Sequence, residues 1–209
     1  MNTRLLSIAG VLALSLALVG TASADAVSIS TGIADWQVAA IPDGAPGDLG
    51  PAHVIASHPG WNHTLEVGNV SWIGASEDGA SRGLAGDYVY ELSMELAPGT
   101  YNLAAAFTSD NFTTSFKLNG AELLAAPQSD PYSFQSTFTV AGQTSTTPLN
   151  LQVVVHNDTY SVGMSLNNPT GLIVSGEVVA VPVPVPAAAW AGLALLGSLG
   201  AMKTLRRKA

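Results

Sequence analysis

The sequence predicts an all-β protein, namely a single β-sandwich (jelly roll) of about nine strands, flanked by an N-terminal signal-peptide helix and a C-terminal transmembrane helix. The middle of the 209-residue chain is rich in Gly, Ser, Thr, Asn and Val, a mixture that suits short strands joined by turns. No amphipathic helical pattern of useful length occurs there. Each end, by contrast, carries an apolar run next to basic residues.

The clearest strand signal lies in residues 88–96, where every second residue from Tyr88 to Leu96 is apolar and would share one face. The dipeptides Pro98-Gly99 and Asn119-Gly120 mark turns. Residues 43–66 are rich in Gly, Pro and His, and we expect a long loop or lid there. The other predicted strands are residues 26–31, 36–41, 69–73, 101–108, 113–118, 132–140, 149–156 and 171–179.

Charge is distributed unevenly along the chain. Residues 25–180 contain all fifteen acids and only two basic residues, Arg82 and Lys117, so this part carries a net charge of −13. Such a domain repels nucleic acid and anionic lipid, and it suits calcium or neutral sugars. The chain has no cysteine, which excludes thiol catalysis, thiolate metal sites and disulfides.

The first 24 residues have the order of a cleavable signal peptide. Arg4 precedes an apolar run, and the small residues Ala22 and Ala24 form an Ala-x-Ala site. Signal peptidase would therefore release a mature chain that begins at Asp25. The alternative is an uncleaved anchor, although the apolar run is short for a membrane span.

The last 29 residues have three parts. Residues 181–186 alternate Val and Pro, which ends the strand ladder in an extended spacer. Residues 187–202 are an apolar helix-former that could span the inner membrane together with its flanks. Residues 203–209 are basic and should stay cytoplasmic, so the domain of residues 25–180 would lie outside the inner membrane.

This tail resembles the PEP-CTERM sorting signal of Gram-negative bacteria, although Val183 and Val185 stand where the commonest form has Glu. The resemblance implies recognition by an exosortase-type membrane protease and release to the cell surface or an extracellular matrix. It also implies association with exopolysaccharide and biofilm. A plain single-pass anchor is the alternative. The residues that carry the resemblance are Val181, Pro182, Val183, Pro184, Val185, Pro186, Trp190, Arg206, Arg207 and Lys208.

Residues 70–179 resemble galactose-binding-like jelly rolls, as found in carbohydrate-binding modules. The resemblance rests on the strand that leads into Ser109-Asp110-Asn111, the strand and turn that end at Asn119-Gly120, and the entry to the last strand at Asn168-Pro169. It implies a noncatalytic, carbohydrate-binding module, but a fold does not fix a function.

Four residues are candidates for ligand contact: Trp61, Asn62, Asp110 and Asn111. Trp61 lies in a predicted loop, so we expect it to be exposed, where its flat ring could stack on a sugar. Trp36 and Trp72 lie in predicted strands and are expected in the core.

A structural calcium ion could bind to this chain, with Asp43, Asp48 and Asp110 as candidate ligands, because carboxylates are hard-ion ligands. No calcium-loop spacing supports it, and turn-forming Asp and Asn residues explain the same pattern. The histidines at 53, 58 and 63 could meet on a metal only within a loop, and a solvated loop is the simpler interpretation.

Catalysis has little support in the sequence. Residues 79–83 match a nucleophile elbow, but no helix follows the serine. Three hypotheses remain. A polysaccharide-binding surface module predicts an exposed aromatic ring, and a structural matrix protein without a small ligand predicts buried tryptophans. A secreted hydrolase predicts a cleft with two carboxylates or a serine near a histidine.

Overall fold

The computed structural model describes residues 26–78, 83–123, 135–145, 148–158, 168–182, 191–192 and 194–198. Asp25–Val181 form one compact unit, and Met1–Ala24 with Pro182–Ala209 form another. In the second unit the described residues 191–192 and 194–198 are helical. Among the described residues, no helix has the length and apolar character needed to cross a membrane. Ala22, Ala24 and the sorting-signal residues after Pro182 lie outside the described residues, so their roles stay predictions.

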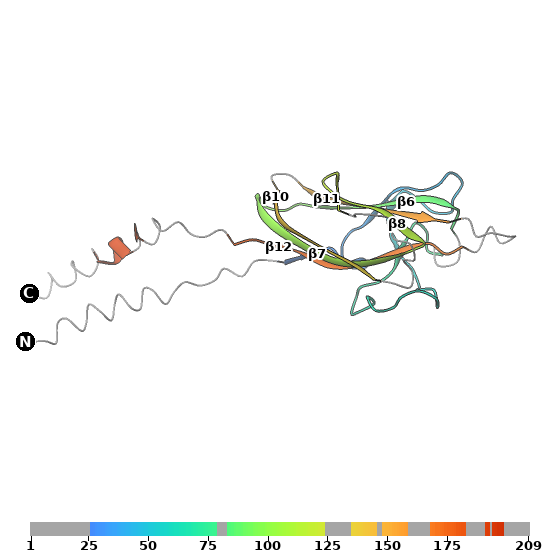
Figure 1. Ribbon diagram of the computed structural model, residues 1–209, viewed down its shortest axis with the longest axis horizontal. Helices are drawn as coiled ribbons and strands as arrows, with labels where there is room; N and C mark the ends of the chain where they lie inside the picture. The colour runs from blue at the N-terminus through green and yellow to red at the C-terminus, as the bar shows by residue number, and fades with distance from the viewer. Residues whose placement is uncertain are drawn as a thin grey trace, which may run out of the picture. The chain divides into compact units, whose positions relative to one another are not determined.

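The first unit is a β-sandwich of two antiparallel six-stranded sheets, which confirms the predicted sandwich (Figure 1). Sheet A has the order β10-β7-β12-β5-β4, with β1 also paired to β12. Sheet B has the order β3-β2-β6-β11-β8-β9. The strands of sheet A are β1 (Ala26–Ser28), β4 (His53–Val54), β5 (Ile73–Gly74), β7 (Gly99–Asp110), β10 (Ser136–Ser145) and β12 (Gly171–Ala180). Those of sheet B are β2 (Gln37–Ala40), β3 (Gly50–Pro51), β6 (Gly86–Met94), β8 (Phe112–Leu118), β9 (Ala121–Glu122) and β11 (Leu149–Asn157).

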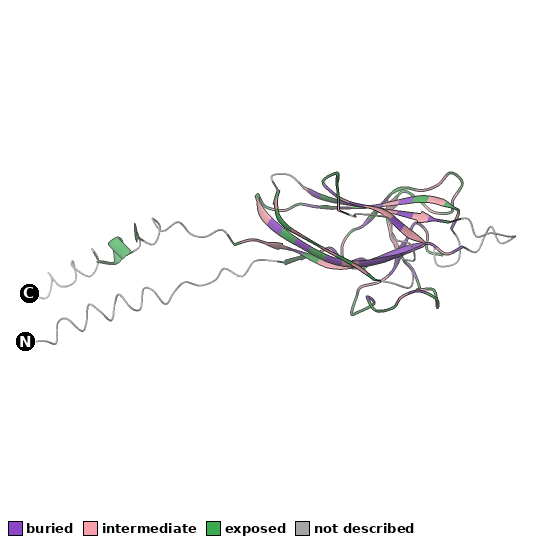
Figure 2. Cartoon of the chain, in the orientation of Figure 1, coloured by how far each residue is buried: buried purple, intermediate pink, exposed green. Residues whose placement is uncertain are grey.

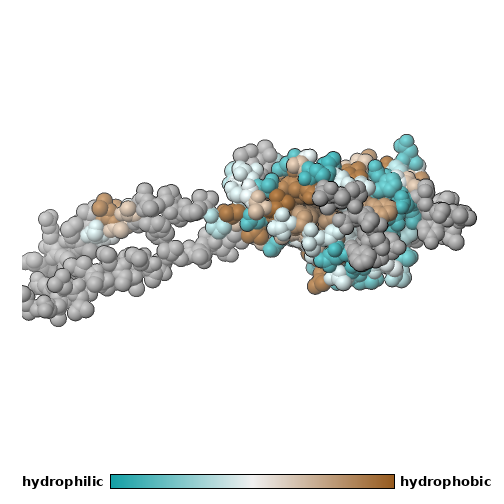
Figure 3. Space-filling view, viewed as in Figure 1, coloured by the Kyte–Doolittle hydropathy of each residue, from teal (hydrophilic) through white to brown (hydrophobic). Residues whose placement is uncertain are grey.

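The core between the sheets follows from residues that alternate along each strand. In β6 the buried positions Tyr88, Tyr90, Leu92 and Met94 alternate with outward residues, as predicted, while Leu96 lies beyond the strand and packs at the edge of the core. Figure 2 shows this alternation along both layers. Figure 3 shows hydrophobic residues gathered between the two layers on one side of the domain, with hydrophilic residues around them. Each fully buried large side chain contributes about 1.5–3 kcal/mol to folding.

Three aromatic rings connect the two sheets. Phe107 of β7 and Phe138 of β10 contact Phe116 of β8, with ring centroids 5.2 and 4.5 Å apart. Such tilted or edge-on pairs add about 0.5–1.5 kcal/mol beyond the burial of their area. These contacts fix how the two sheets face one another.

The predicted strands differ from the structure in two respects. The strand expected at 69–73 is wrong, because only Ile73 and Gly74 pair there, while Asn69 lies in a turn and residues 70–72 belong to no strand. The predicted 43–66 loop contains the two-residue strands β3 and β4, and β9 was not expected. Strands this short have no periodicity that a sequence pattern could detect.

Candidate functional site

Residues 55–72, which connect β4 to β5, form a compact loop on the outer face of sheet A; we call it the tryptophan loop. Its apolar residues Ile55, Trp61, Leu65 and Trp72 pack on Ile173 as a second small core. Ile173 faces outward because its neighbours on β12, Leu172 and Val174, belong to the main core. The two indole rings lie 4.1 Å apart, so the loop is held to the sheet by its own side chains.

Two carboxylates accept the indole N–H groups of this loop. Trp61 Nε1 donates to Asp110 Oδ2 at 2.6 Å, and Trp72 Nε1 donates to Glu66 Oε1 at 2.9 Å. The Glu66 carboxylate also meets His63 Nδ1 at 2.9 Å. Burial raises the pKa of Asp110 from 3.8 to about 6, although the hydrogen bond from Trp61 acts in the opposite direction. Asp110 therefore holds a buried charge at neutral pH, which costs stability.

The expectation that Trp61 is exposed is wrong. Its side chain is only 4% exposed, because the loop folds back over Trp72 and Ile173. Trp36 and Trp72 are buried as predicted. Asn62 lies in the same loop, but its Oδ1 accepts hydrogen bonds from the backbone N–H and the hydroxyl of Thr64. Such bonding is typical of a turn-forming Asn.

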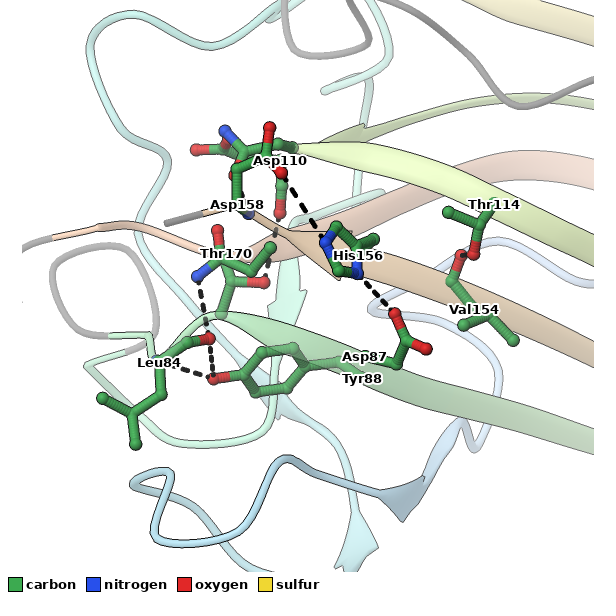
Figure 4. Close-up of polar contacts among 11 residues, drawn as sticks. Leu84, Asp87, Tyr88, Asp110, Thr114, Val154, His156, Asp158 and Thr170 are labelled. Carbon is green, nitrogen blue, oxygen red and sulfur yellow. Dashed lines mark hydrogen bonds and ion pairs between the residues drawn. The ribbon is translucent and has the colours of Figure 1, made fainter. Parts of the chain in front are cut away.

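Asp110 and Asn111 belong to a polar network at the rim where β6, β8 and β12 begin and β7 and β11 end (Figure 4). Asn111 Nδ2 donates to Asp110 Oδ1 at 2.7 Å, and Asn111 Oδ1 accepts from the Asp158 N–H at 2.7 Å. His156 lies between Asp158 and Asp87, with Nε2 at 3.6 Å from Asp158 and Nδ1 at 2.6 Å from Asp87. The structure thus brings together three of the four predicted contact residues, Trp61, Asp110 and Asn111.

Most polar groups of this rim are occupied by protein partners. The carbonyl oxygen of Asp110 accepts from the Thr170 hydroxyl, and Asn168 Nδ2 donates to Asn157 Oδ1. Such a satisfied network stabilises the strand ends and leaves few lone pairs for a ligand.

The predicted calcium ligands do not meet. Among the described residues, no three His, Asp or Glu side chains form a group that could hold a metal ion, so Asp43, Asp48 and Asp110 are not such a cluster. Asp43 and Asp48 are exposed, and the backbone N–H of Asp48 donates to the Ala75 carbonyl. Asp43 therefore lies in a turn, which is the alternative given above, whereas Asp48 lies outside the turns of the described chain.

A shallow groove of about 670 Å³ lies on the outer face of sheet A, and we call it the alanine groove. Its floor is Ala104 and Ala106 of β7, which face away from the core residues Leu103, Ala105 and Phe107. Cross-strand registers put Ser175 and Thr137 beside Ala106. They put Glu177 and Thr139 beside Ala104, and Ser28 beside Glu177. The remaining lining residues are Ala26, Ser30, Ala105, Phe138 and Gly176.

The groove exists because small side chains form its floor while hydroxyls and one carboxylate rise from the neighbouring strands. Ala106 also packs against the tryptophan loop, so the loop borders one end of the groove. No pattern in the sequence predicts this site as a whole. The sequence of β7 contains a signal for the floor of the groove, because its outward positions are small and its inward positions are apolar. This pattern does not show which strands lie beside β7 and form the sides of the groove.

A second hollow, of about 210 Å³, lies on the outer face of sheet B. It is lined by Glu91, Lys117, Gly120, Asn150, Leu151 and Gln152. Gln152 Nε2 donates to Glu91 Oε1 at 2.7 Å. In the part of the chain that the structure describes, each of the two hollows has a single carboxylate, Glu177 or Glu91. Neither therefore has the pair that glycoside hydrolysis requires.

No protein-family model matches the chain, and no curated protein matches it at a significant level. Several solved structures share its β-sandwich. One is the CBM36-1 domain of a multidomain xylanase from the hindgut metagenome of Trinervitermes trinervoides, with 10% identity, a TM-score of 0.34, and coverage of 76% of this chain and 99% of that one. Another is the CBM35 domain from Paenibacillus barcinonensis, with 14% identity, a TM-score of 0.32, and coverage of 76% and 99%. A third is the PA14 sugar-binding domain from an RTX adhesin, with 15% identity, a TM-score of 0.29, and coverage of 79% and 76%.

These structures are mostly sugar-binding modules by name, but the likenesses are distant. They carry no argument about which residues of this chain bind a ligand.

Proposed function

We propose that this chain is an exported, noncatalytic module that binds a polysaccharide in the alanine groove. The observation that carries the proposal is the groove itself. It is open and elongated across four strands, as a site for a polymer must be, and it offers hydroxyl groups from Ser28, Thr137, Thr139 and Ser175.

The chemistry of the groove fits a neutral sugar better than a charged ligand. The alanine floor can contact the apolar faces of sugar rings, while the hydroxyls and the Glu177 carboxylate can bond to sugar hydroxyls. An anionic polymer would meet Glu177 and the acidic domain around it. No aromatic side chain other than Phe138, which packs in the core, lines the described groove, so we expect weak binding.

Affinity electrophoresis of the full chain tests this proposal, with gels that contain the producer's exopolysaccharide or one of a panel of neutral glycans, with and without calcium. Ala104→Ile fills the floor with a larger side chain that still suits a strand. We expect it to reduce affinity by about tenfold or more, equivalent to about 1.4 kcal/mol. Glu177→Gln should have a smaller effect, because it removes charge and keeps an acceptor.

Ser93→Ile is the matched control. Ser93 is exposed on the outer face of sheet B, on the central strand β6. This variant should bind as the unchanged chain does. Equal loss of binding in both variants would contradict the assignment to the alanine groove.

A structural matrix protein without a small ligand is the second candidate. The burial of Trp36, Trp61 and Trp72 supports it, because a matrix protein has no need of an exposed aromatic platform. If no glycan retards the chain in any gel, this second function becomes the better one.

Export and sorting rest on the sequence alone. Signal peptidase would cut after Ala24, and an exosortase-type protease would remove the tail that contains Arg206, Arg207 and Lys208. The mature protein would then reach the cell surface or a biofilm matrix. Mass spectrometry of the native protein should give an N-terminus at Asp25 and a C-terminus before Lys203. A native fragment that retains residues 203–209 would contradict sorting cleavage.

A further inference from the structure

The alanine groove is longer across the strands than along them. Its lining includes residues 175–177 of β12, 104–106 of β7 and 137–139 of β10, together with residues at and just after β1. Neighbouring strands lie about 4.8 Å apart and rise about 3.3 Å per residue, so the groove is about 14 Å long across the strands and about 7 Å wide along them. A polymer that fills the groove therefore lies across the strands.

Along the strands the groove is bordered at both ends. At one end, the tryptophan loop packs on Ile173 of β12, and the Thr64 hydroxyl of this loop donates to Gln135 Oε1 at 3.2 Å, just before β10 begins. Ile173 and Gln135 each lie two residues from a residue that lines the groove. At the other end lies Asn102 of β7, whose Oδ1 accepts a hydrogen bond from the Gly142 N–H at 3.1 Å. Larger side chains therefore bound the alanine floor in this direction.

Across the strands the groove is open. β1 and β10 are the outermost strands of sheet A at the level of the groove, and the described chain has no strand beyond either of them. β5 pairs with β12 only at Leu172, which does not line the groove. Nothing in the described part of the chain therefore stops a polymer from passing over both edges of the sheet.

The polar side chains of the groove are available to a ligand. In the part of the chain that the structure describes, the side chains of Thr137, Thr139, Ser175 and Glu177 make no hydrogen bond or ion pair. The rim around Asp110 differs, because its polar groups already bond to one another. The registers place one of the four polar side chains on each side of both floor alanines. Contacts to a ligand are therefore spread along the groove instead of gathered at one point.

We infer that the alanine groove binds an internal segment of a polysaccharide, which lies across the strands and continues past both edges of sheet A. This inference rests on the proposed function, since it names the part of the polymer that the same groove recognises. The methyl groups of Ala104 and Ala106 contact the faces of the sugar rings. Glu177 and Thr139 bond to sugar hydroxyls on opposite sides of Ala104.

Recognition of an internal segment makes affinity depend on the length of the ligand. A single sugar ring is shorter than the groove, so it contacts the polar groups on only one side of Ala104 at a time. A longer oligosaccharide contacts both sides, and each added hydrogen bond strengthens binding. The two chain ends contribute nothing, because they lie beyond the edges of the sheet.

The test is a competition experiment with the full chain, in affinity gels that contain the neutral glycan that retards it most. The competitors are the monosaccharide, disaccharide, trisaccharide and hexasaccharide of that glycan. We expect the hexasaccharide to compete about tenfold more strongly than the monosaccharide, or better. A hexasaccharide with its reducing-end ring opened by reduction should compete as well as the unmodified one. The same holds for a hexasaccharide with a blocking group at its non-reducing end.

Two variants test whether the segment occupies both sides of Ala104. Thr139→Val removes a hydroxyl on β10, and Glu177→Ala removes the carboxylate on β12. Each should weaken binding of the hexasaccharide by about threefold or more. Ser93→Ala is the matched control, because Ser93 is exposed on the outer face of sheet B, and this variant should bind as the unchanged chain does.

The outcomes separate this inference from the proposed function. If no glycan retards the unchanged chain, the proposed function fails and the inference fails with it. If a glycan retards the chain but the monosaccharide competes as well as the hexasaccharide, the proposed function stands and the inference is overturned. Loss of competition after modification of one end would also overturn it, because the groove would then recognise a chain end. So would weaker binding in only one of Thr139→Val and Glu177→Ala.

Discussion

Replacing Asp110 with Asn removes a buried charge while keeping a side chain of the same shape. The pKa of Asp110 rises from 3.8 to about 6 because the carboxyl is buried under the tryptophan loop. At about 1.4 kcal/mol per pKa unit, ionisation of Asp110 costs about 3 kcal/mol of the free energy of unfolding. Asp110→Asn abolishes this cost at pH 7.

The gain is partly offset by a lost hydrogen bond. The two oxygens of Asp110 accept from Trp61 and from Asn111, and an amide has only one oxygen. Losing one acceptor costs about 1 kcal/mol. We therefore expect Asp110→Asn to stabilise the folded protein by about 2 kcal/mol at pH 7, the difference between these two quantities.

The pH dependence follows from the direction of the shift. Between pH 3.8 and about pH 6, the Asp110 carboxyl group of the folded protein binds its proton more tightly than that of the unfolded chain does, because burial raises its pKa. The contribution of Asp110 to stability is therefore most favourable at low pH, falls as pH rises through this window, and is fully lost above it. Urea unfolding from pH 4 to 7.5 should show the two proteins diverging in this window. A constant difference across it, or a less stable variant at pH 7, would refute the reasoning.

Two further predictions concern buried aromatic residues. Trp61→Phe removes the hydrogen-bond donor to Asp110 and should destabilise the protein by about 1–3 kcal/mol in urea unfolding. Glycan retention should stay unchanged, because Trp61 is buried and does not line the alanine groove. Lost retention in a variant of unchanged stability would contradict this prediction. Tyr90→Phe should be neutral or stabilising, because no described group bonds to the buried Tyr90 hydroxyl. Its control, Tyr88→Phe, should lose about 1 kcal/mol, because the Tyr88 hydroxyl bonds to both backbone groups of Leu84. The opposite order of stabilities in thermal unfolding would show that the Tyr90 hydroxyl has a partner.

The long strands were predictable from sequence because their alternation is set by the core. β6, β7, β8, β11 and β12 lie within a few residues of the predicted ranges. The error at 69–73 had a physical cause, since Val70 and Trp72 pack into the small core of the tryptophan loop rather than extending a strand. Apolar residues alone do not distinguish these two environments.

The site was less predictable than the fold. The sequence predicts an exposed Trp61 because its neighbours Pro59, Gly60 and Asn62 are typical of turns, but a long loop can bury its own aromatic residue. The alanine groove depends on registers among β1, β12, β7 and β10, which come from distant parts of the chain. Sequence periodicity shows which residues of one strand share a face, but it does not show which strands lie beside that strand in the sheet.

The tryptophan loop begins and ends at a fixed pair of strands, since His53 pairs with Gly74 and Val54 with Ile73. The described backbone hydrogen bonds of residues 56–70 all close local turns. The length and sequence of the segment can therefore change without shifting the register of any sheet strand. The tryptophan loop beside the alanine groove could therefore vary among copies of the gene. Such variation could alter the ligand specificity of the groove while the β-sandwich stays intact.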